Sequence, residues 1–156
     1  MDFWTEDKKI GIKISKYIIQ NLFSKCRKSK DIETGGILLG YYCMNYTCAI
    51  IEEITDSPED SKKGRAYFIR GVKGLQKIID KFWKNNKIYY LGEWHYHPAD
   101  SRRLSGTDIN QIKAITDSNQ YNCPEPICII VSKKNNSEYN IDCYLYSNKT
   151  SVVKLL

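Results

Sequence analysis

The pattern of apolar and polar positions along this chain predicts strands that alternate with helices. Apolar residues recur three and four positions apart, as on one face of a helix, in residues 15–28, 72–85 and 105–117. They alternate or run together, as in strands, at 10–14, 33–42, 47–54, 65–69, 88–97, 127–131, 141–146 and 152–156. For residues 8–15, a helix that begins earlier is the alternative. Polar residues with glycine or proline predict loops at Thr55–Gly64 and Asn119–Pro126.

The order of these elements predicts an α/β fold. The run Ile127–Val131 is apolar throughout, which is typical of a central strand covered on both faces. Residues 33–42 and 47–54 are expected to pair through a turn near Met44 and Asn45, while helices separate other strands. We therefore expect a mixed sheet with helices on both faces, a three-layer α-β-α arrangement. The chain of 156 residues is enough for one core, so residues 1–156 are predicted to form a single domain.

Composition removes several classes of function. Apolar content of 42% and charged content of 27% are ordinary for a globular protein, and no run of eighteen apolar residues predicts a transmembrane helix. The acidic segment Met1–Glu6 lacks a signal-peptide core, so a cytoplasmic protein without a membrane partner is expected. The net charge of +6 comes from lysines spread along the chain, which does not favour nucleic-acid binding. Six cysteines without a C-x-x-C motif are expected to be reduced thiols.

The segment Gly92–Pro98 carries the strongest chemical signal. It contains the only two histidines of the chain, His95 and His97. Residues i and i+2 of a strand point to the same face, so the two imidazoles can lie side by side before Pro98 ends the strand. Asp108 follows at the start of a predicted helix and can bring a carboxylate to the same point. Two imidazoles and one carboxylate are the three-ligand set of a catalytic zinc site whose fourth position is left to water.

Ser105 and Asp108 also have a purely structural interpretation. Ser-x-x-Asp before a helix resembles a capping box, and Leu104 and Ile109 occupy the positions of a hydrophobic staple. Spacing alone favours this capping role. The two roles are compatible for Ser105 but compete for the carboxylate of Asp108. The histidines just upstream favour the metal role.

Two glutamates are candidates for the base that a zinc-bound water needs. Glu33 comes just before the glycines of the predicted strand 33–42, and one carboxylate can first take a proton and later return it to a leaving amine. A lone glutamate at such a position is more often a surface residue. Glu93, beside the histidines, is the other candidate for the base. It can instead orient an imidazole by a hydrogen bond without contacting the metal.

The full set of residues resembles the JAMM (MPN+) metalloprotease family. The family pattern is Glu, a long gap, His-x-His, seven residues, Ser, two residues and Asp, and this chain matches it from Glu33 through His95, His97 and Ser105 to Asp108. The sequence around the motif is most similar to that of bacterial deconjugating proteases found beside antiviral nucleotide-signalling operons. Tyr96 stands where Ser or Thr is frequent in the family, and Leu104 where Pro is frequent. Neither change removes a ligand, but both can alter the shape of the groove and the choice of substrate.

The resemblance implies a fold, a metal and roles for individual residues. It implies the MPN (cytidine-deaminase-like) fold and one Zn²⁺ per chain, held by His95, His97 and Asp108. Glu33 is implied as the catalytic base and acid, and Ser105 as the residue that stabilises the oxyanion. The implied reaction is hydrolysis of the amide between the C-terminal tail of a ubiquitin-like or similarly conjugated protein and an amine. An activating or conjugating enzyme encoded nearby is the implied partner.

Other functions stay open at this point. A catalytically silent scaffold of the same fold and a metal-dependent amidase acting on small peptides are the two alternatives. The loop before Ser105 contains Arg102 and Arg103, which can grip a substrate tail or simply lie in solvent, and the second interpretation is favoured.

Overall fold

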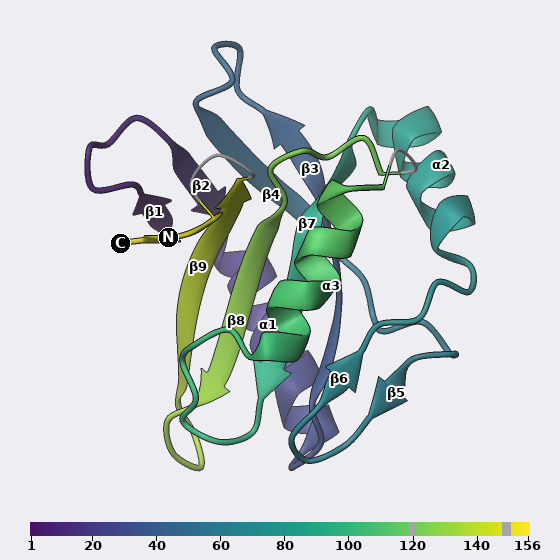
Figure 1. Cartoon of the computed structure of the whole chain (residues 1–156), viewed down its shortest axis with the longest axis vertical. Helices are drawn as coiled ribbons and strands as arrows, with labels where there is room; N and C mark the ends of the chain where they lie inside the picture. Colours follow the sequence, from purple (N-terminus) through teal and green to yellow (C-terminus); the bar gives the residue numbers. More distant parts are fainter. Residues whose placement is uncertain (119–120, 148–150) are drawn as a thin grey trace.

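The computed structural model describes residues 1–118, 121–147 and 151–156, so Asn119 and Gln120 of the predicted loop lie outside the described residues. A large sheet with eight strands, in the order β1-β2-β4-β3-β7-β8-β9-β10, forms the centre of the molecule (Figure 1). The strands are β1 (Asp2–Trp4), β2 (Gly11–Ile14), β3 (Thr34–Tyr42), β4 (Cys48–Ile54), β7 (Tyr89–His97), β8 (Ile127–Lys133), β9 (Tyr139–Ser147) and β10 (Ser151–Leu155). The pairs β2–β4 and β7–β8 are parallel and the others antiparallel, which confirms the predicted mixed sheet.

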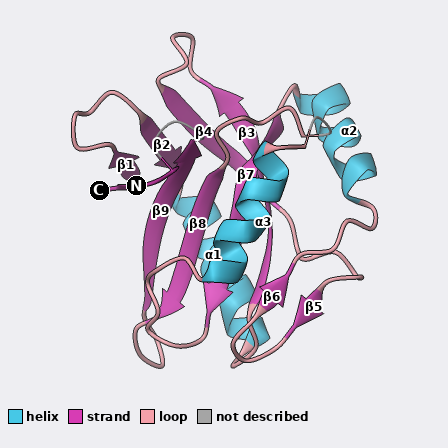
Figure 2. Ribbon diagram, in the orientation of Figure 1, coloured by secondary structure: helices cyan, strands magenta, loops and turns pink. Residues whose placement is uncertain are grey.

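Helices cover both faces of this sheet. Helix α1 (Lys16–Ser29) lies behind the sheet in the view of Figure 2, and α3 (Gly106–Thr116) lies in front of it. The alternation of β8 shows the same division, because Ile129 shares a core cluster with Leu22 of α1, while Ile130 shares one with Ile112 of α3. Helix α2 (Leu75–Asn86) packs through Leu75 in a third cluster with residues of β3 and β7. The predicted α/β class is therefore confirmed.

The described helices include none that is both long and apolar enough to cross a membrane.

Several predicted boundaries were wrong. Helix α2 begins at Leu75 instead of Val72, because Gly74 has a left-handed φ of 80° and the backbone N–H groups of Val72 and Lys73 donate to the Asp60 carboxylate. Trp83, predicted on the buried face of that helix, is 52% exposed.

Short strands account for most other differences. Strand β1 was not predicted, and of the predicted strand 65–69 only β6 (Phe68–Ile69) forms, paired with β5 (Lys62–Lys63) inside the predicted loop.

The connection between β7 and β8 sets the position of the candidate site. These strands are parallel, so the chain must cross over between them, and α3 is that crossover. The N-terminus of α3 therefore follows the carboxyl end of β7. In α/β sheets, ligands bind beyond the carboxyl ends of the strands.

Candidate active site

The two histidines lie at the buried end of β7. This strand is flanked on both sides, by β3 and β8, and its residue His95 is fully buried. Trp94 and Tyr96 belong to the core cluster on the α1 face, so His95 and His97 point to the opposite face, where α3 lies. The predicted side-by-side placement of the imidazoles is confirmed.

Asp108, in the first turn of α3, meets both imidazoles. Its Oδ1 atom lies 2.6 Å from Nδ1 of His95, and its Oδ2 atom lies 3.5 Å from Nε2 of His97. The other ring nitrogen of His97 donates to the carbonyl oxygen of Ser101 at 2.9 Å. The three predicted ligand side chains therefore converge at one buried point.

Ser105 caps α3 and contacts the same carboxylate. Its hydroxyl oxygen accepts from the backbone N–H of Asp108 at 3.1 Å, and Oδ2 of Asp108 accepts from the backbone N–H and the hydroxyl of Ser105, each at 2.7 Å. The expected capping box is thus present. Oδ2 of Asp108 serves the cap and lies near His97, while Oδ1 faces His95. The expected competition between the cap and a metal for this carboxylate stays a prediction.

Glu33 stands at the edge of this group of residues. It comes directly before Thr34, which pairs with Tyr96 between the two histidines, and its backbone N–H donates to the carbonyl oxygen of Gly64. Burial raises the pKa of the Glu33 carboxyl, and the charges of His97, Asp108 and His95 also act on it. A carboxylate with a raised pKa beside the ligand set suits a group that takes and returns a proton.

Glu93 also faces the site, behind His95. Its Oε2 lies 3.3 Å from Nε2 of His95, and its Oε1 accepts from Nε of Arg70. It therefore does not lie in front of the imidazoles, where a catalytic base would act. Arg70 was missed in the sequence, because nothing in its short segment after β6 links it to a residue 23 positions away.

The fold and this arrangement can be compared with known proteins. Residues 15–144 match the family described as prokaryotic homologues of the JAB domain, Prok-JAB. The chain belongs to the Prok-JAB family.

Relatives of this Prok-JAB protein carry names of enzymes. It is 36% identical over 153 residues to a "CD-NTase/cGAS isopeptidase" of Enterobacter hormaechei subsp. hoffmannii, with 98% of this chain and 84% of the relative covered. It is 27% identical over 121 residues to the "Probable metalloprotease y4qB" of Sinorhizobium fredii, with 76% and 73% covered. The solution structure of protein DSY2949 from Desulfitobacterium hafniense has a TM-score of 0.68 at 17% identity, with 92% and 88% covered, which shows a shared fold.

The donor atoms of the Prok-JAB site fit a zinc ion by chemistry. Two imidazoles and one carboxylate are a common ligand set for catalytic zinc, and two ligands of one tetrahedral zinc are roughly 3.3 Å apart. The 3.5 Å between His97 and Asp108 is close to that spacing. The 2.6 Å between His95 and Asp108 is instead a direct hydrogen bond, and within the described part of the chain no group of three His, Cys, Asp or Glu side chains is set around an ion as it stands.

The pKa shifts of His95 and Asp108 show how strongly these two groups interact. Burial alone would lower the pKa of His95, but hydrogen bonds to Asp108 and Glu93 raise it to about 9. Burial alone would raise the pKa of Asp108, but hydrogen bonds from His95, His97 and Ser105 and the positive charge of His95 hold it well below its usual range. A cation that takes the place of the imidazole protons would satisfy the same carboxylate.

The two arginines before Ser105 have different surroundings. Arg102 donates to both oxygens of the buried Asp142, at 2.9 and 3.0 Å, so it is not a purely solvated side chain as the favoured interpretation held. Arg103 is exposed.

Proposed function

We propose that this protein is a zinc-dependent isopeptidase. It would hydrolyse the amide that joins the C-terminal tail of a ubiquitin-like or similarly conjugated protein to an amine. The observation that supports this most directly is the convergence of His95, His97 and Asp108 at the carboxyl end of β7, with Glu33 and Ser105 beside them. The names of the relatives point to a conjugate that contains a CD-NTase-type protein.

The proposal gives each of these residues a role. His95, His97 and Asp108 would hold the zinc, which when bound lowers the pKa of a water to about 7 and polarises the substrate carbonyl. Glu33 would accept the proton of the attacking water and then donate it to the nitrogen of the breaking C–N bond, leaving a carboxylic acid and an amine. Ser105 would turn its hydroxyl from Asp108 to the oxyanion and stabilise it.

Two variants test this proposal together. The purified protein should contain close to one zinc per chain by elemental mass spectrometry, and His97→Ala should lose it. Glu33→Gln should keep the zinc and the fold but lose cleavage of a protein conjugate by about 10²–10⁴-fold, the usual size of an acid–base contribution. Absence of zinc from the zinc-supplemented wild type, or full activity of Glu33→Gln, would overturn the proposal. Short peptides tested beside the conjugate separate an isopeptidase from an amidase of small substrates.

A further inference from the structure

Behind His95 lies a buried ionic network that the ligand set does not include. Glu93, 1% exposed, and Arg70, 8% exposed, form an ion pair between Oε1 and Nε. A buried ion pair is costly unless its remaining hydrogen-bonding groups are also satisfied. In this network, hydrogen bonds from several residues satisfy the ion pair and hold the carboxylate of Glu93 against His95.

The carboxylate of Glu93 is held from several sides. Oε1 accepts from Arg70 and from the hydroxyl of Tyr90 at 3.3 Å, while Oε2 accepts from the side-chain amide of Gln111 at 3.3 Å. The same Oε2 faces Nε2 of His95 at 3.3 Å. Each oxygen therefore has donors from different elements, namely β7, α3 and the segment after β6.

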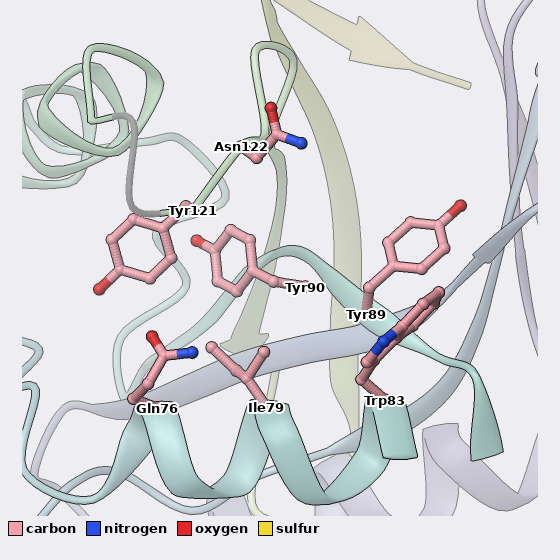
Figure 3. A pocket seen from close by; sticks show the side chains of 7 residues that line it. All are labelled: Gln76, Ile79, Trp83, Tyr89, Tyr90, Tyr121 and Asn122. Carbon is pink, nitrogen blue, oxygen red and sulfur yellow. The ribbon is translucent and has the colours of Figure 1, made fainter. Parts of the chain in front are cut away.

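Arg70 is fixed in turn. Its Nη1 donates to the carbonyl oxygen of Gly71 at 2.7 Å, its Nη2 donates to the hydroxyl of Tyr121 at 3.0 Å, and its backbone N–H donates to the side-chain oxygen of Gln111 at 3.0 Å. The rings of Tyr90 and Tyr121 lie side by side, with centroids 4.8 Å apart, in a groove of about 370 Å³ between α2 and β7 (Figure 3). The carboxylate of Glu93 therefore cannot turn away from His95 without breaking its bonds to Arg70, Tyr90 and Gln111.

We propose that Glu93, clamped by Arg70, is a positioning residue that fixes the ring orientation and tautomer of His95. This inference rests on the proposed function, because it takes His95 as a zinc ligand. A neutral His95 that donates from Nε2 to Glu93 leaves Nδ1, the nitrogen facing Asp108, free as the ligand atom. His97 is held the opposite way, because its Nδ1 donates to Ser101 and its Nε2 faces Asp108.

Zinc affinity measures this role without any substrate. Glu93→Gln keeps the shape of the side chain and an oxygen for Arg70, but its amide cannot serve as the carboxylate acceptor for Nε2–H. Competition with a chromophoric chelator should give a zinc dissociation constant about 10–100-fold higher than that of the wild type. Asp142→Asn is the matched control, because Asp142 is also a buried carboxylate paired with an arginine but touches neither histidine. The control should keep wild-type zinc affinity.

Imidazole nitrogen NMR gives a second readout that a merely structural residue would not move. The chain has two histidines, so the zinc-loaded protein gives two pairs of ring-nitrogen signals, and they are assigned by His97→Ala in the metal-free state and by titration with zinc. The expected wild-type pattern is a proton on Nε2 of His95 and on Nδ1 of His97. A proton on Nδ1 of zinc-bound His95 overturns the proposal, even if Glu93→Gln fails to fold.

The outcomes separate the two proposals. Wild-type protein that binds zinc with the expected NMR pattern, together with weakened binding in Glu93→Gln, supports both. Zinc binding that is equally tight in Glu93→Gln and the wild type overturns the positioning role alone. Wild-type protein that binds no zinc overturns the proposed function and the positioning role with it.

Discussion

The Oδ1 atom of Asp108 lies 2.6 Å from Nδ1 of His95, although the two residues are 13 positions apart and belong to a helix and a strand. The contact depends on the parallel pairing of β7 with β8, which makes α3 cross the sheet directly after the histidines. Strand β3 flanks β7 on the other side and lies very close to it at the level of His95.

Gly35 provides that close approach and gives the first prediction. A Cβ atom at Gly35 would lie 2.3 Å from the carbonyl oxygen of Trp94 and 3.0 Å from Cδ2 of His95. Gly35→Ala should therefore lower the free energy of unfolding by about 1–3 kcal/mol, the usual cost of overpacking. Urea denaturation followed by circular dichroism measures this change.

Gly106→Ala is the matched control for Gly35→Ala. Gly106 is the first residue of α3, and a Cβ atom there would meet no heavy atom within 4 Å. This change should not lower stability and can raise it by up to about 1 kcal/mol, because alanine has less freedom in the unfolded chain. Equal losses in the two variants would contradict the close approach of β3 and β7.

Ser105→Ala separates the structural and chemical roles of that serine. Loss of the cap should lower the free energy of unfolding by about 1 kcal/mol. Loss of oxyanion stabilisation should lower kcat by about 10²–10³-fold. Ser15 caps α1 in the same way, by accepting from the backbone N–H of Ile18, but it lies in another helix. Ser15→Ala should show the stability loss alone, and an activity loss of the same size there would assign the effect of Ser105→Ala to folding.

Much of the fold and site followed from local patterns in the sequence. The period-2 alternation of β7 put His95 and His97 on one face, and the cap signature of Ser105 and Asp108 marked the start of α3. These features depend on neighbours in sequence, so spacing alone predicts them. That residues 1–156 form a single domain stays a prediction.

The parts that the sequence did not predict depend on contacts between distant segments. The start of α2 is set by the Asp60 carboxylate, and the buried partner of Glu93 is Arg70. Strand β1, Asp2–Trp4, forms by pairing with β2 at the edge of the sheet. Three residues are too few to show a strand periodicity in the sequence. Arg102 resembled a solvated residue because its partner Asp142 lies 40 positions away.

Zinc should stabilise the folded protein in proportion to its affinity. An ion that binds only the folded state, at 100 times its dissociation constant, adds about 2.7 kcal/mol to the free energy of unfolding. For a chain of 156 residues this corresponds to a rise in Tm of roughly 5–10 °C. Differential scanning fluorimetry of chelator-treated protein with and without added zinc measures the shift. His97→Ala should show no shift, and an equal shift in that variant would place the bound zinc elsewhere.

The metal-free protein should lose stability as the pH rises from about 6.5 to 8. Burial opposes the charge of His95, but Asp108 and Glu93 raise its pKa in the folded state from 6.5 to about 9. The pKa of His97 is raised as well, against its burial, by Asp108 and by the carbonyl oxygen of Ser101. A raised histidine pKa contributes stability that is fully present below the unfolded value and is lost as the pH rises toward the folded value.

The measurement is urea unfolding in chelator at pH 6, 7 and 7.5, where cysteines of the unfolded chain, with a pKa of about 8.5, remain mostly thiols. The free energy of unfolding should fall at each step in the wild type. Asp108→Asn removes the carboxylate that both imidazoles face, so its dependence on pH should be shallower. A flat wild-type profile, or one that rises with pH, would show that the imidazoles and Asp108 do not form the charged cluster described for the metal-free site.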